Sequence, residues 1–93
     1  MTFIQSIYKY IITEDVTNIK TILGQGLPQV ILNQLLSYAI KQNKLESIKV
    51  LISYCADPYY WLQLNNFYVK YYGNYATREY FKCLSQRNDK PIS

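Results

Sequence analysis

The residues best suited to catalysis are few in this chain, and their spacing argues against most enzymatic chemistry. Histidine is absent from the 93 residues, which removes the commonest zinc ligand and the usual acid-base catalyst at neutral pH. The two cysteines, Cys55 and Cys83, lack C-x-x-C spacing and a histidine that would activate a thiolate. We therefore expect both cysteines to be small buried residues near helix ends, and we expect no enzyme activity, no cofactor and no metal site.

The carboxylates and glycines form no recognisable reaction centre either. Glu14 and Asp15 are adjacent, but the other acidic residues are scattered singly, so no carboxylate pair of the glycosidase kind is predicted. The segment Gly24–Gly26 has a superficial likeness to a phosphate-binding turn, yet no strand precedes it and no lysine follows it. It predicts a helix C-cap instead. Asp57, before Pro58, predicts a loop residue that bonds nearby backbone amides, with a partner contact as the alternative. No small-molecule substrate is expected.

Composition predicts one folded domain over residues 1–93. Hydrophobic residues make up 49% of the chain, aromatic residues 16% and charged residues 17%, which is far from the composition of a disordered segment. The net charge is +4, but the basic residues are spread from Lys9 to Lys90 without a block. A dedicated nucleic-acid surface concentrates its Lys and Arg residues, so nucleic acid is not the favoured partner.

Targeting signals are not apparent in the sequence. The N-terminal segment lacks the basic leader and uninterrupted apolar run of a signal peptide, and no stretch approaches the roughly 20 apolar residues of a membrane span. With only two cysteines, a cytoplasmic or other intracellular location is expected. Abundant Ile, Lys, Asn and Tyr fit an AT-rich genome, so a secreted effector of a parasite or virus is a further hypothesis. Met1 favours a complete protein.

Helical apolar stripes that could position a binding surface recur about 29 residues apart. They comprise Val16, Ile19, Ile22 and Leu23, and then Leu45, Ile48, Leu51 and Ile52. The first two units predict helices over 2–13, with Thr2 as N-cap, 16–23, 29–41 and 45–54, separated by Gly/Pro and Asp-Pro boundaries. In a third unit, Leu64, Phe67, Tyr68 and Tyr71 mark one helix, and Tyr80, Cys83 and Leu84 mark another. The units are roughly 2–28, 29–58 and 59–87, followed by a frayed tail over 88–93.

The second unit resembles an ankyrin repeat. The family pattern A-x-x-x-G-x-x-x-x-V-x-x-L-L-x-x-G-A-D is matched in order and spacing by Ala39, Asn43, Ile48, Leu51, Ile52, Cys55, Ala56 and Asp57. The first unit supplies Ile19, Ile22, Leu23 and Gly26 at the same places, and the third supplies Gly73. The T-P-L-H-x-A opening is missing from every unit, Cys55 replaces a glycine, and the period is about 29 to 30 where the family has 33.

This resemblance implies an all-α fold of about three stacked antiparallel helix pairs, an ankyrin-like solenoid with shortened or missing β-hairpin fingers. A different helix-pair array and a non-repetitive helical bundle are the structural alternatives. Because stacked helical units usually bind macromolecules, the favoured function is a non-enzymatic module that binds or masks a protein partner, with a host-directed or effector-neutralising role as a further hypothesis. A nucleic-acid-binding protein and a self-associating structural protein, for example a homodimer, are the alternatives.

An aromatic run between Tyr54 and Phe81 suggests where a partner would bind. One helix cannot bury all of its aromatic side chains against a single neighbour, so some must lie at the surface. Exposed Tyr and Trp side chains are typical anchors of protein interfaces. The predicted partner-binding residues are Asp57, Tyr59, Tyr60, Trp61, Tyr68, Tyr72 and Tyr75. The alternative is that Trp61 belongs to the core and that some tyrosines merely cover the end of the stack.

Overall fold

The computed structural model describes the backbone of residues 3–88 and the side chains of residues 5–86. Every element in this part of the chain is an α-helix, which confirms the all-α prediction there. The elements are α1 (Phe3–Thr13), α2 (Val16–Leu23), α3 (Gln29–Lys41), α4 (Leu45–Ser53), α5 (Leu62–Tyr72) and α6 (Tyr75–Asn88). The first four helices lie where the sequence predicts them, to within a residue at each end. The predicted N-cap Thr2 and the tail after Asn88 lie outside the described residues.

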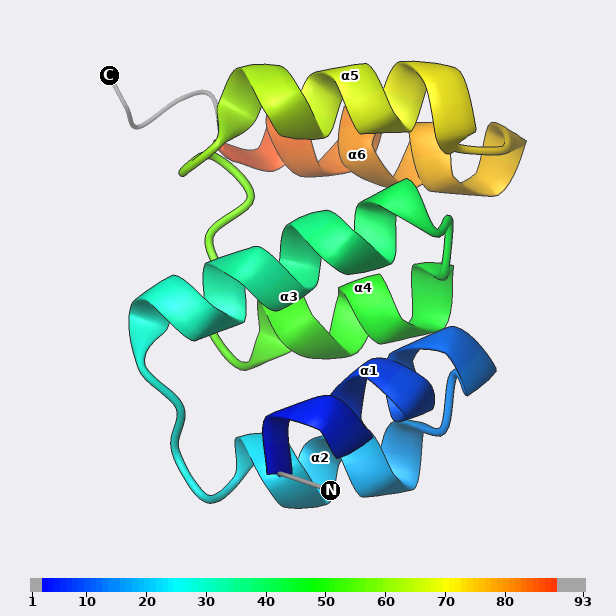
Figure 1. Ribbon diagram of the computed structural model, residues 1–93. Helices are drawn as coiled ribbons and strands as arrows, with labels where there is room; N and C mark the ends of the chain where they lie inside the picture. The colour runs from blue at the N-terminus through cyan, green and yellow to red at the C-terminus, as the bar shows by residue number, and fades with distance from the viewer. Residues whose placement is uncertain (1–2, 89–93) are drawn as a thin grey trace.

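Consecutive helices pair as hairpins, and the three hairpins stack along one direction (Figure 1). Short turns join the helices within each pair at one edge of the molecule, and the longer segments 24–28 and 54–61 join successive pairs at the other edge. Helices α1, α3 and α5 form one layer, and α2 and α4 lie behind it. The third pair attaches mainly through the packing of α5 on α3. None of the described helices is long and apolar enough to cross a bilayer.

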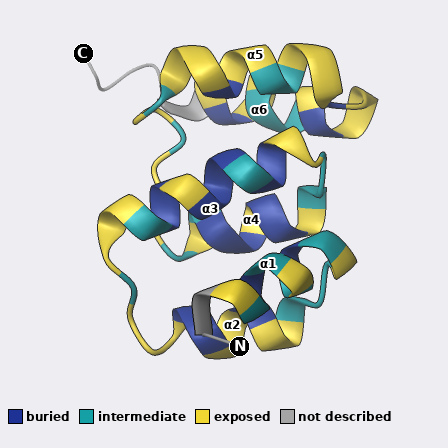
Figure 2. Ribbon diagram, viewed as in Figure 1, coloured by how far each residue is buried: buried dark blue, intermediate teal, exposed yellow. Residues whose placement is uncertain are grey.

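The hydrophobic core occupies the first two helix pairs (Figure 2). The repeated stripes supply much of it: Ile19 and Ile48 are fully buried, and so is Leu51. α3 contributes the largest share, because Leu35, Leu36, Ala39 and Ile40 are all inaccessible to solvent. In the third pair, the buried side chains are mostly small or polar, and Leu84 is the one buried large hydrophobic residue among those described. The third pair therefore adds little to the core and much to the surface.

Left-handed backbone conformations repeat with the sequence. Glu14 and Asn43 have φ values of 55° and 57°, and Gly26 and Cys55 have φ values of 88° and 75°. Each pair is separated by 29 residues. After α4, the amide of Cys55 donates to the carbonyl of Ile52, and the next amide reaches back to Leu51, which is the Schellman arrangement that usually has glycine at the left-handed position. The duplication is thus visible in the backbone as well as in the apolar stripes.

Hydrogen bonds from one helix pair to the next follow the same repeat. The N-cap residue of α4, Lys44, offers no side-chain acceptor, and the Glu14 carboxylate of the preceding pair accepts the Glu46 amide at 3.1 Å instead. One pair later, Asn43 Oδ1 accepts the Asn74 amide at the start of α6, also at 3.1 Å. In both cases, a residue just after the first helix of one pair accepts a hydrogen bond from a backbone amide at the start of the second helix of the next pair.

Buried hydroxyl groups reinforce these junctions. Ser47 in α4 donates through Oγ to the carbonyl of Ile11 at 2.9 Å, and Thr77 in α6 donates through Oγ1 to Asn43 Oδ1 at 2.8 Å. Both hydroxyl-bearing side chains are completely buried, so each needs the partner that the preceding helix pair provides. The polar contacts therefore fix how successive pairs are placed.

The prediction that both cysteines are buried is wrong. Cys55 and Cys83 are free and exposed. The left-handed conformation at Cys55 ends α4 and leaves its side chain at the surface, while the following residue, Ala56, is buried. Cys83 lies next to the buried Leu84 on α6 and faces solvent. In both cases the adjacent residue takes the buried position.

Candidate functional site

The orientation of α5 differs from the one that its hydrophobic pattern suggests. Asn65 is the residue that this helix buries, with only 3% of its surface exposed. Its Oδ1 atom accepts a hydrogen bond from Ser37 Oγ of α3 at 2.6 Å, and its Nδ2 atom donates to the carbonyl of Pro58 at 3.0 Å. A polar contact with α3 and the preceding loop therefore sets which face of α5 points inward.

Three of the four stripe residues of α5 consequently face solvent, and the fourth, Tyr68, is half-buried against the core. Leu64, Phe67 and Tyr71 follow helical spacing, and they are 42%, 49% and 61% exposed. Much of the α5 ribbon is accordingly coloured as exposed in Figure 2. The rings of Phe67 and Tyr71 lie 4.6 Å apart, centroid to centroid. We call these three residues the outer stripe of α5. Such a continuous apolar stripe on an outward face is a candidate interface, because isolated exposed apolar residues are common whereas contiguous ones are not.

The loop before α5 extends this surface. Tyr59 and Tyr60 are exposed, and Trp61 is half-buried with its ring edge-on to that of Tyr60 at 5.1 Å. Together with the first turn of α5, these residues border an open hollow of about 500 Å³. The predicted loop residues and the outer stripe of α5 thus form one surface, which continues through Leu64.

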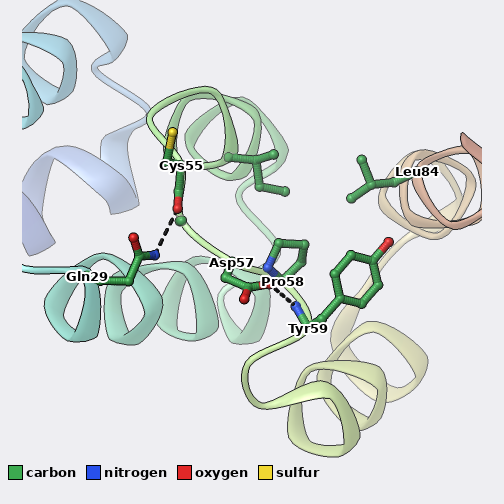
Figure 3. A pocket seen from close by; sticks show the side chains of 8 residues that line it. Gln29, Cys55, Asp57, Pro58, Tyr59 and Leu84 are labelled. Carbon is green, nitrogen blue, oxygen red and sulfur yellow. Dashed lines mark hydrogen bonds between the residues drawn. The ribbon is translucent and has the colours of Figure 1, made fainter. Parts of the chain in front are cut away.

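A second hollow, of about 460 Å³, lies on the other side of Tyr59 (Figure 3). The ring of Tyr59 points from the loop toward Leu84 of α6. Asp57 Oδ1 accepts the Tyr59 amide at 2.8 Å, which confirms the predicted bond from this carboxylate to a loop amide. Gln29 Nε2 donates to the carbonyl of Cys55 at 2.8 Å and ties the loop to the start of α3. These bonds hold the loop on the stack and present its aromatic side chains.

The other predicted residues lie at the far end of α5. Tyr72 and Tyr75 are exposed, the latter to 77%, whereas Tyr68 is half-buried against Tyr72. The seven predicted residues therefore form two groups, one at each end of α5. The outer stripe of α5 connects the groups, and sequence reasoning did not nominate it as part of the site. The signal that would have revealed it is Ser37, a polar residue on the core helix α3 that requires a polar partner.

Three cations gather at the C-terminal end of α5. The ammonium groups of Lys41 and Lys70 lie 5.9 Å and 5.5 Å from the ring centroids of Tyr68 and Tyr71, within the range of cation–π attraction. Arg78 donates to the carbonyl of Lys70 at 2.8 Å. Within the described residues, none of the three forms an ion pair with a carboxylate. We call Lys41, Lys70 and Arg78 the cationic end of α5.

The side chains of this surface are mainly aromatic, aliphatic and cationic. The chain contains no histidine, and among the described side chains no three His, Cys, Asp or Glu residues lie close enough together to hold a metal ion. The surface instead offers exposed aromatic and aliphatic groups with positive charge at one end.

No family model, curated protein or solved structure matches this chain.

Proposed function

We propose that this protein is a non-enzymatic interaction module, an ankyrin-like stack of helix pairs that binds a partner protein through the outer stripe of α5 and the loop Tyr59–Trp61. The observation that carries the proposal is the orientation of α5, which buries Asn65 against Ser37 and turns Leu64, Phe67 and Tyr71 to solvent. The free energy falls when a partner protein removes exposed aromatic groups of this kind from water.

The size of the surface supports this proposal. Eight of the exposed large hydrophobic residues lie between Tyr59 and Tyr75, and their exposed fractions range from 42% to 77%. With 150 to 250 Å² for an aromatic side chain, they present roughly 800 Å² of mostly apolar area. A standard protein interface buries about 800 Å² on each partner. A partner that covered this surface would therefore bury an area typical of a specific complex.

Several features support the ankyrin-like part of the proposal. The 29-residue spacing of left-handed residues places Gly26 and Cys55 where the family pattern has its glycine. Helix pairs stacked in this way contact only their neighbours, and the last pair leaves a flank uncovered.

The two exposed free thiols, Cys55 and Cys83, fit a reducing compartment.

Site-specific photo-crosslinking tests the proposed function. A photoreactive benzoylphenylalanine is placed at position 71 in the outer stripe, at position 60 in the loop and, as a control, at the exposed position 21 on α2. Illumination in cells that make the protein is expected to give the same discrete protein adducts from positions 60 and 71 and none of them from position 21. Equal adducts from all three positions, or none, would refute the proposal. Nucleic-acid adducts from positions 60 and 71 would support the nucleic-acid alternative instead.

A further inference from the structure

Helix α5 leaves one apolar face open to another helix. α3 is covered by α1 on one flank and by α5 on the other, whereas α5 has a helix of this layer on one flank only. Ser37 and Lys41 lie one turn apart on α3. Ser37 contacts Asn65 of α5, and Lys41 contacts Tyr68 of α5. The outer stripe lies about 100° around α5 from Asn65 and Tyr68, on a face that is exposed to solvent, and side chains spaced in this way form ridges that pack against a helix.

The charges around α5 indicate which kind of helix fits. The cationic end has three positive groups and no carboxylate in ion-pair contact among the described residues. A second copy of this chain would bring the same three cations and a net charge of +4. Against those cations it would bring only one exposed carboxylate near the start of α5, that of Asp57. Charge complementarity therefore favours an acidic partner over a second copy.

We infer that the outer stripe of α5 receives an amphipathic helix of another protein, antiparallel to α5, with acidic residues in its first turn. This inference rests on the proposed function and names the partner class for the same surface. Antiparallel docking brings the first turn of the partner helix to the cationic end of α5. The helix dipole of the partner favours acidic side chains in its first turn, and so does the cationic end of α5. The two effects therefore favour acidic residues at the same positions. Apolar residues at i, i+3 or i+4, and i+7 of the partner would cover Leu64, Phe67 and Tyr71.

A displayed library of helical peptides tests the inference on the full chain. Each 16-residue peptide keeps a fixed leucine stripe, and three first-turn positions vary among Glu, Gln and Lys. Selection is run against the wild type, Phe67→Glu, the double variant Lys70→Glu/Arg78→Glu, and Thr21→Glu as a control for added charge on α2. Thermal unfolding of each target verifies that it is folded.

Glutamate is expected to dominate the first turn of peptides selected on the wild type and on Thr21→Glu. The all-Glu peptide should bind about tenfold more tightly than its all-Lys counterpart at low salt, as two or three exposed ion pairs allow, and the difference should shrink at high salt. Lysine should dominate on the Lys70→Glu/Arg78→Glu target, and binding to Phe67→Glu should be lost.

The contrary outcomes separate the inference from the proposed function. Selection without charge preference, or with unchanged preference on the double variant, would overturn the acidic helix and leave the interface in place. Failure to select any peptide that depends on Phe67 would overturn helix docking. The crosslinking experiment would still show whether a partner protein binds this surface. A wild type that sediments as a dimer, with Phe67→Glu a monomer, would show that a second copy occupies the face and would refute the inference.

Discussion

Replacing Asn43 tests whether one helix pair stabilises the next. Its Oδ1 atom accepts the Asn74 amide at 3.1 Å and the Thr77 hydroxyl at 2.8 Å, and its φ of 57° is left-handed. Losing two hydrogen bonds and leaving the fully buried Thr77 hydroxyl without its acceptor costs about 2 kcal/mol. Alanine adds about 1 kcal/mol of left-handed strain that glycine avoids. We therefore expect Asn43→Ala to lose about 3 kcal/mol and Asn43→Gly about 2 kcal/mol of unfolding free energy.

Urea unfolding with native-state hydrogen exchange measures this effect. Thr77→Val removes only the hydroxyl and should lose about 1 kcal/mol, and its effect should largely vanish in an Asn43→Gly background because the two residues act as a pair. Amides of α6 should lose protection before those of α1 to α4. An Asn43→Gly variant as stable as the wild type, or lost protection confined to α3, would refute a role for Asn43 in joining the pairs.

Further predictions concern the backbone and the thiols. Cys55→Gly should raise the unfolding free energy by about 1 kcal/mol because φ is 75° there, and a decrease would contradict this reasoning. Gly26→Ala should lower it by about 1 kcal/mol from its φ of +88° alone, since an added Cβ would meet no atom within 4 Å; an unchanged urea midpoint would count against this. Gly73→Ala should cost about 2 kcal/mol, since the new Cβ would lie 2.6 Å from the Val69 carbonyl oxygen, and wild-type stability would show that the turn adjusts. Both thiols, those of Cys55 and Cys83, should react with a chromogenic disulfide in the folded protein nearly as fast as in urea, whereas slow reaction would indicate burial.

The first two helix pairs are well predicted because local signals and burial agree. Gly24, Gly26 and Pro28 mark the end of α2, and the stripes around Ile19 and Ile48 are the residues that the core buries. In the third pair, the same kind of stripe correctly marks a helix but does not show which way the helix faces. Asn65 takes the inward position because Ser37, 28 residues away in sequence, and Pro58, in the preceding loop, offer it partners. Helical periodicity carries no information about such partners.

Only part of the candidate site could be predicted, because the sequence pattern does not give the orientation of α5. Aromatic composition identifies the segment from Tyr59 to Tyr75, and exposure of Tyr59, Tyr60, Tyr72 and Tyr75 follows because one helix cannot cover them all. The outer stripe of α5 joins the two groups of predicted residues, but its members are not among the predicted partner-binding residues, although Phe67 and Tyr71 belong to the aromatic run.

The junction hydrogen bonds also bear on how the protein is made. Glu14 and Asn43 each belong to an earlier helix pair, and each satisfies an amide of a helix that the ribosome produces later. For these two bonds, the acceptor is therefore already in place when the helix that donates to it emerges. Synthesis from the N-terminus then matches the order in which the pairs can form. A circular permutant that begins at residue 29 would reverse this order for α4 and should fold more slowly.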